Sequence, residues 1–99
     1  MADHSVLVYV TSIPSDMGLD EIEEPLTQAI EQAGVGEFDG NDIGPTGAIL
    51  FMYGPDADAL FAAVESTLRA APLGPGSYAV KRYGDHGDPD AREERVDLK

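Results

Sequence analysis

Two short polar segments hold the side chains best suited to chemistry. The first contains Asp39, Asn41 and Asp42, and oxygen ligands of this kind bind Ca²⁺ when they alternate along a loop that ends in a bidentate glutamate. Ile43 and Gly44 interrupt that spacing. Because Asp, Asn and Gly tolerate left-handed backbone, the sequence favours a structural turn at this point.

The second polar segment contains His86, Asp88 and Asp90. One imidazole and two carboxylates without a second nearby histidine are a weak set of metal ligands. The glycine-rich turns match neither the GxxxxGKS/T nor the GxGxxG phosphate-binding pattern, and no serine has a base placed to activate it. We therefore predict no catalytic, cofactor-binding or metal-binding residue, and an enzyme with its pocket on an open sheet face stays an alternative.

Four segments are expected to form strands. Residues 5–12 and 46–53 are apolar on both faces, which is typical of strands at the centre of a sheet. Residues 36–44 and 77–83 carry glycine or charge, which favours edge strands. The polar segment around Asp39 is therefore expected at an edge of the sheet.

Two amphipathic helices are expected between the strands. In the first, apolar residues recur at intervals of three and four over 19–33, and Gly34 ends the helix. Pro25 predicts either a kink or a helix that begins at that proline. The second helix has Pro55 in its first turn and stops at Pro72. Its expected core residues are Leu60, Phe61 and Val64.

The element order βαββαβ predicts an α+β fold. In the ferredoxin-like arrangement, four antiparallel strands lie in the order 4-1-3-2 and both helices cover one face of the sheet. This order places the two apolar strands in the middle, so we predict this sandwich as a single domain over residues 1–84. Residues 85–99 hold few apolar side chains and are expected to form a charged, flexible tail.

The sheet face opposite the helices is expected to stay open. Val6, Val8 and Val10 are predicted to face the helices, which leaves Leu7 and Tyr9 on the other side. Open apolar faces of soluble proteins usually mark interfaces, so we predict a homodimer formed through the sheet. The residues expected on the open face are Tyr9, Phe51, Tyr53, Lys81 and Tyr83.

Charge is distributed unevenly along the chain. It has 19 acidic and 6 basic residues, a formal net charge of −13, and no Lys or Arg before Arg69. Such a surface repels phosphates and anionic lipid headgroups, so we predict no direct binding to nucleic acid or to a membrane. The absence of cysteine, of a long apolar run and of a secretory signal favours the cytoplasm.

Three motifs carry a resemblance to known proteins. EFDGND at 37–42, YGPDADALF at 53–61 and KRYGD at 81–85 resemble a family of small, acidic, largely uncharacterised bacterial proteins with the same βαββαβ plan. In size, acidity and plan, the chain is also similar to the bacterial inhibitor of ribonuclease E and to immunity proteins that neutralise toxins. These similarities imply a regulator of another protein, and they assign no catalytic residue.

These observations predict a small acidic, non-catalytic interaction protein that binds a basic partner protein and inhibits or regulates it. Its carboxylates would speed association with a surface rich in Lys and Arg. In one alternative the charge serves only solubility, and in another a homodimer binds a small molecule on the open face. The predicted partner-binding residues are Asp20, Glu23, Glu24, Glu31, Glu37, Asp39 and Asp42.

Overall fold

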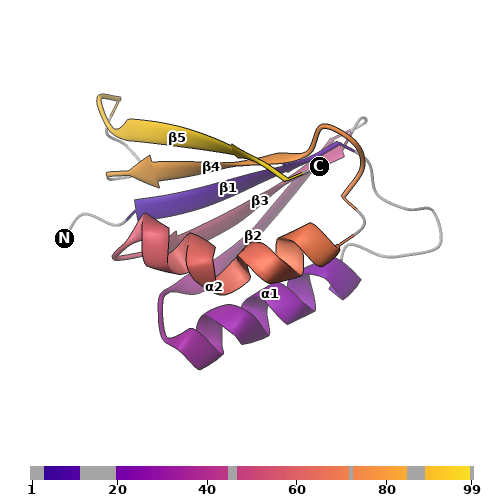
Figure 1. The fold of residues 1–99 in the computed structure, drawn as a ribbon, viewed down its shortest axis with the longest axis horizontal. Helices are drawn as coiled ribbons and strands as arrows, with labels where there is room; N and C mark the ends of the chain where they lie inside the picture. The colour runs from indigo at the N-terminus through magenta and orange to yellow at the C-terminus, as the bar shows by residue number, and fades with distance from the viewer. Residues whose placement is uncertain (1–3, 12–19, 45–46, 72, 85–88, 99) are drawn as a thin grey trace.

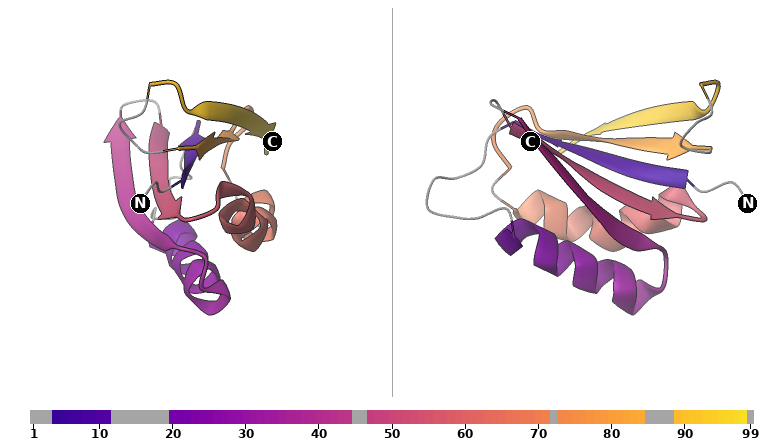
Figure 2. Two further views of the ribbon diagram at one scale, coloured as in Figure 1. Left: turned by 90° about the vertical axis from the view of Figure 1, so that its left-hand side faces the viewer. Right: turned by 180° about the vertical axis from the view of Figure 1, so that it is seen from behind.

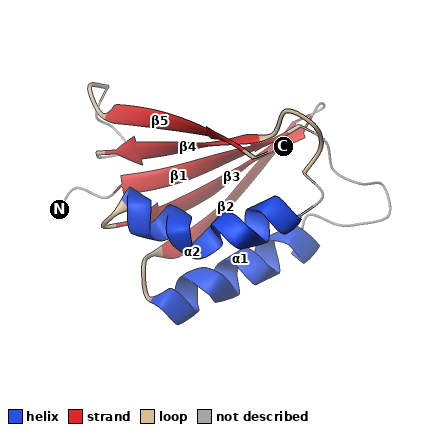
Figure 3. Ribbon diagram, in the orientation of Figure 1, coloured by secondary structure: helices blue, strands red, loops and turns tan. Residues whose placement is uncertain are grey.

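The chain forms an α+β fold in which two helices pack on one sheet (Figures 1 and 3). The computed structural model describes residues 4–11, 20–44, 47–71, 73–84 and 89–98. No helix in this part of the chain has the length and apolar character needed to cross a membrane. The elements are β1 (His4–Val10), α1 (Asp20–Ala33), β2 (Glu37–Gly44), β3 (Gly47–Gly54), α2 (Ala57–Ala70), β4 (Tyr78–Tyr83) and β5 (Arg92–Asp97).

All neighbouring strands of the sheet are antiparallel, and their order is β2-β3-β1-β4-β5. Both helices lie on one side of the sheet (Figure 2), with α1 beside β2 and α2 against β1, β3 and β4. The α+β class is therefore confirmed, but the prediction of four strands is wrong. The expected order 4-1-3-2 becomes 5-4-1-3-2, because a further strand pairs with β4 and takes its place at the edge.

The additional strand, β5, comes from a segment with little apolar character. Residues 92–97 pair with β4, so this part of the segment 85–99 that was expected to be a flexible tail is a strand. The Arg95 guanidinium lies 3.8 Å from the centre of the Tyr78 ring, and Leu98, directly after the strand, is buried in the core. Cross-strand stacking, ion pairs and the apolar contacts of Val96 and Leu98 with the core therefore hold β5. Composition alone does not reveal these contacts.

The core fills the space between the helices and the sheet. Val6, Val8 and Val10 are buried on the helix side of β1, as predicted from their alternation. The predicted residues of α2, Leu60, Phe61 and Val64, are also buried. The central strand β3 contributes Ala48, Leu50 and Met52.

The first helix, α1, is held by one apolar stripe. Ile22, Leu26 and Ile30 recur every four residues and are fully buried. Pro25 lies inside α1, so the helix does not begin at that proline. Gly34 follows the last helical residue with φ 66°, a left-handed conformation that glycine adopts without strain and that ends the helix as predicted.

Two side chains cap the second helix, α2. Asp56 is the N-cap, and its Oδ1 accepts a hydrogen bond of 3.0 Å from the backbone N–H of Asp58. The N–H of Ala57 donates to Nδ1 of His4 over 3.1 Å. Pro55 therefore precedes the helix instead of lying in its first turn. The bond to His4 joins the start of α2 to the start of β1.

Candidate functional site

One side of the molecule carries all the basic side chains that the structure describes. They lie on α2, β4 and β5, and each forms an ion pair, so we name this surface the paired edge. Its pairs are Arg69 with Glu65 (2.9 Å), Lys81 with Asp58 (3.1 Å), Arg82 with Glu93 (2.9 Å), Arg92 with Glu94 (3.9 Å) and Arg95 with Asp97 (3.0 Å). Exposed pairs of this kind each stabilise a fold only slightly, but together they neutralise the surface.

The opposite edge of the sheet begins with carboxylates of α1. Glu23 accepts a hydrogen bond from Nδ2 of Asn41 in β2, which identifies the side of α1 that faces the edge strand. Glu24, the next residue, points about 100° further round the helix, and Glu31 follows Glu24 by about two turns and points the same way as Glu24. Both are exposed. The side chain of Asp20, also predicted here, lies outside the described part of the chain.

The edge strand β2 adds three exposed carboxylates on the other side of the same edge. In the register with β3, Glu37 and Asp42 lie on the open face of the sheet. Asp39 lies at a β-bulge beside Gly40, whose φ of 143° favours glycine. The expected turn around Asp39 is thus a bulge within a strand. We name six residues the acidic edge: Glu23, Glu24, Glu31, Glu37, Asp39 and Asp42.

The acidic edge has no ion pair with any cation in the part of the chain that the structure describes. Its negative charge affects a neighbouring hydroxyl: the pKa of Tyr53 is raised, first by burial and then by Asp39. β2 is also the last strand of the sheet on this side. The acidic edge therefore combines uncompensated charge with the main-chain hydrogen-bonding groups of an edge strand.

The open face of the sheet consists of three rows of side chains that run across the five strands. The centres of the first two rows are apolar and aromatic, whereas the third row has Ser5 at its centre and Arg82 beside it. Most of the charged residues lie on β2 and β5. From β2 to β5, the rows are Asp42, Ile49, Tyr9, Tyr78 and Asp97; Gly40, Phe51, Leu7, Val80 and Arg95; and Glu37, Tyr53, Ser5, Arg82 and Glu93. The structure thus places Tyr9, Phe51 and Tyr53 on the open face, where all three are half-buried.

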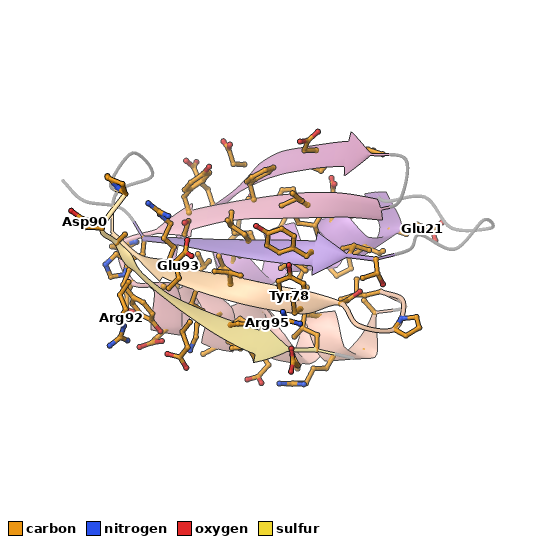
Figure 4. The ribbon with its side chains drawn as sticks, turned by 90° about the horizontal axis from the view of Figure 1, so that it is seen from above. Glu21, Tyr78, Asp90, Arg92, Glu93 and Arg95 are labelled. Atoms are coloured by element: carbon orange, nitrogen blue, oxygen red, sulfur yellow. The ribbon has the colours of Figure 1, made fainter. Side chains whose placement is uncertain are left out.

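Three side chains of the open face form a stack. The rings of Tyr9 and Tyr78 are parallel to within 13° with their centres 4.7 Å apart, and Arg95 lies over Tyr78 (Figure 4). Burial raises the pKa of Tyr9, with smaller contributions from Tyr78 and Glu93. Beside this stack is a hollow of about 560 Å³, lined by both tyrosines and by Asp42. It is wide and open, which suits contact with a surface.

Lys81 and Tyr83, which were expected on the open face, lie on the helix side of β4. Ala79 of the same strand is fully buried, and residues two and four positions further along a strand point the same way. Lys81 Nζ lies 3.1 Å from Oδ1 of Asp58 in the first turn of α2, and the Tyr83 hydroxyl donates to the same oxygen. These two bonds, that of Tyr83 first, lower the pKa of Asp58, and the bond to Asp58 raises the pKa of Lys81.

Tyr78 and Arg95 were not predicted on the open face. Tyr78 was missed because Lys81 and Tyr83 of the same strand were assigned to that face, and Arg95 was missed because residues 92–97 were assigned to a tail. A signal was nevertheless present in the charges. In the register of β4 with β5, Lys81 lies opposite Glu94 and Arg82 opposite Glu93. Opposite charges at facing positions stabilise a strand pair, so the KR and EE dipeptides together could have indicated the additional strand.

The candidate metal ligands of the sequence do not come together in the part of the chain that the structure describes. Among the described residues, no group of three or more His, Asp or Glu side chains is placed to hold a metal ion. In the candidate calcium segment, the Asn41 amide is bonded to Glu23. His86 and Asp88 lie outside the described residues. Comparisons with protein-family models, curated proteins and solved structures found no match.

Proposed function

We propose that this protein binds a basic partner protein through its acidic edge and thereby inhibits or regulates that partner. The observation that carries the proposal is the separation of charge across the sheet. The described bases are all paired on α2, β4 and β5, and the acidic edge has no ion pair among the described residues. A charge excess confined to one edge gives the molecule a direction in which a cationic surface is attracted.

The shape of the acidic edge favours a protein partner over a bound cation. Its carboxylates are spread over α1 and β2 instead of converging on one point, whereas Ca²⁺ needs six to eight oxygens within about 2.6 Å. Spread charge acts on an approaching surface until salt screens it, beyond about 8 Å at physiological ionic strength. The edge strand can also add main-chain hydrogen bonds to an extended segment of the partner.

Inhibition would follow from occupancy of the partner's basic groups. A nuclease or toxin that acts on nucleic acid holds phosphates with Lys and Arg. Carboxylates such as Glu24 and Asp39 are ligands for the same side chains. A partner covered by the acidic edge could not hold its phosphate substrate at the same time.

Two variants of equal net charge separate recognition from solubility. Each removes four negative charges from exposed or half-buried positions, and only their locations differ. The acidic-edge variant carries Glu24→Gln, Glu31→Gln, Glu37→Gln and Asp39→Asn. The paired-edge control carries Glu65→Gln, Glu93→Gln, Glu94→Gln and Asp97→Asn.

The test compares the proteins that each immobilised chain retains from a cell extract, quantified by mass spectrometry. We expect the wild-type chain and the paired-edge control to retain the same basic protein. The acidic-edge variant is expected to retain about tenfold less of it. Equal retention by the two variants would show that the charge serves only solubility, and the proposal would be wrong.

A further inference from the structure

We propose that the open face is covered by a second copy of this chain, in a two-fold symmetric dimer whose axis runs parallel to the strands. This inference rests on the side chains of the open face and on the charges at its rims. It does not depend on the partner of the acidic edge. Its occupant is the chain itself, so the contact is isologous, with the same patch on both copies.

The centre of the open face has the composition of an interface core. Leu7, Phe51 and Val80 form its middle row, with Tyr9 and Tyr53 in the rows on either side. All five are only half-buried, and no described element covers them, since both helices lie on the other side (Figure 2). Contiguous apolar faces on soluble proteins mark interfaces, and aromatic residues are enriched at the centres of such interfaces.

The open face is also large enough for a stable contact. Five strands spaced about 4.8 Å apart and about 20 Å long give a face of roughly 500 Å² in projection. Its accessible surface is larger, because side chains project from it. A standard interface buries about 800 Å² of accessible surface on each partner. Two copies that meet over the whole face therefore bury an area of the same order.

Charge at the two rims decides the orientation. The β2 rim carries Glu37, Asp39 and Asp42. The opposite rim carries Glu93, Arg95 and Asp97 of β5, where Glu93 is paired with Arg82 of β4 and Asp97 with Arg95. Sheets packed face to face align to within about 30°, so the axis can run across the strands or along them. An axis across the strands sets β2 over β2 and brings the acidic rims together. An axis along the strands sets β2 over β5, so that Asp42 lies over Asp97 and Glu37 lies over Glu93. Each of these β5 carboxylates is already paired with an arginine of its own chain, so the acidic rim meets a rim of balanced charge instead of a second unpaired one.

This orientation covers Glu37 and Asp42 of the acidic edge, which lie on the open face, and leaves its α1 part accessible. Glu24 and Glu31 lie on the helix side of the sheet, away from the contact. The dimer would therefore present two such surfaces. A partner with two basic sites could engage both at once, which raises its effective affinity without any new contact.

Sedimentation equilibrium of the full chain tests the contact. At high micromolar concentration in moderate salt, we expect twice the chain mass of 10.5 kDa. Phe51→Glu places a carboxylate at the centre of the contact and is expected to weaken the dimer about 100-fold. The control Ile43→Glu changes a side chain that is 61% exposed and lies on the helix side of β2, and it is expected to leave the dimer intact. A monomeric wild-type chain, or a folded Phe51→Glu variant that dimerises normally, would overturn the proposal.

Cross-linking tests the orientation and needs no destabilising change. The chain has no cysteine, so an introduced thiol is unique. Asp42→Cys and Asp97→Cys lie in the same row at opposite edges of the open face. Packed sheets are about 10 Å apart, a distance that a short bismaleimide spans. We expect cross-linked dimers from a mixture of the two variants and not from either alone. Dimers from Asp42→Cys alone would overturn the orientation, and none from any combination would overturn the contact.

Discussion

The two edges of the sheet use the same acidic side chains in different ways. On β5, Glu93 and Glu94 lie opposite Arg82 and Lys81 of β4, and each forms an ion pair with the base it faces. On α1 and β2, the carboxylates of the acidic edge have no such neighbour among the described residues. The role of a carboxylate thus depends on whether a basic side chain lies opposite it on the neighbouring strand or helix. It does not depend on the total charge of the chain.

This difference gives charge opposite effects on stability at the two edges. Facing charges of opposite sign stabilise a strand pair, and like charges side by side destabilise it. The paired edge therefore supports the fold, whereas the acidic edge weakens it slightly. The proposed role in binding accounts for carboxylates that do not help the fold.

Two phenylalanines, one beneath each edge, test whether the core contributes more stability under the paired edge than under the acidic edge. Phe61 of α2 is 6% exposed and lies beneath Lys81 of the paired edge, 5.4 Å from Nζ to the ring centre. We expect Phe61→Ala to lower the free energy of unfolding by about 3–5 kcal/mol. Phe38 of β2, beneath the acidic edge, is only partly buried, so Phe38→Ala should cost less, about 1–3 kcal/mol. Chemical denaturation measures both free energies of unfolding. A larger loss for Phe38→Ala than for Phe61→Ala would show that the core beneath the acidic edge contributes more to stability.

Two aliphatic residues test the role of β5 in the fold. Leu98 is buried in the core directly after the paired edge, whereas Ile43 at the acidic edge is 61% exposed. Leu98→Ala is expected to cost about 2–4 kcal/mol of unfolding free energy. The matched change Ile43→Ala should stay within about 0.5 kcal/mol. If thermal and chemical denaturation show no loss for Leu98→Ala, the C-terminal strand does not contribute to the fold.

The four-site variants test the opposite effects of charge directly. The paired-edge control removes carboxylates that face bases, so we expect it to lose roughly 1–2 kcal/mol of unfolding free energy at low salt. The acidic-edge variant relieves repulsion and should gain up to about 0.5 kcal/mol. Both changes should shrink as salt rises, because exposed charges are screened. A destabilised acidic-edge variant would mean that these carboxylates support the fold after all.

The smallest expected effect is the contribution of Asp58 to the pH dependence of the unfolding free energy. Bonds from Tyr83 and Lys81 lower the pKa of this carboxyl from its ordinary value of 3.8. Since the folded state then binds the proton less tightly than the unfolded state, Asp58 stabilises the fold above that value, and the contribution is lost as pH falls through the folded pKa. The stability difference between wild type and Asp58→Asn is therefore expected to narrow from about pH 6 to about pH 2. If the difference in unfolding free energy between wild type and Asp58→Asn is the same at every pH in this range, the hydrogen-bonded carboxylate of Asp58 is not the source of that difference.

Much of the fold could be predicted from the sequence because hydrophobic periodicity reports burial. The alternation of Val6, Val8 and Val10 and the four-residue spacing of Ile22, Leu26 and Ile30 located the helix side of the sheet and the buried side of α1. β5 could not be predicted in this way. Its stability depends on cross-strand partners, and those are known only once the register is known.

The candidate site likewise has features that could be predicted from the sequence and features that could not. Exposure of Glu24, Glu31 and Asp39 followed from their polar surroundings in the sequence. The side on which Lys81 and Tyr83 lie did not, because β4 has both apolar and polar residues on each face and only Ala79 fixes its orientation. The sequence could place charges on an edge, but it could not show which charges were paired.

The role of the acidic edge in recognition is tested by the rate at which the captured partner associates with the wild-type chain and with the two four-site variants. At low salt, we predict that the acidic-edge variant associates about tenfold more slowly than wild type, while the paired-edge control, with the same net charge, associates at nearly the wild-type rate. The gap between the two variants should close as salt screens the carboxylates. Equal rates for the two variants, with no response to salt, would contradict the assignment of the acidic edge as the binding surface.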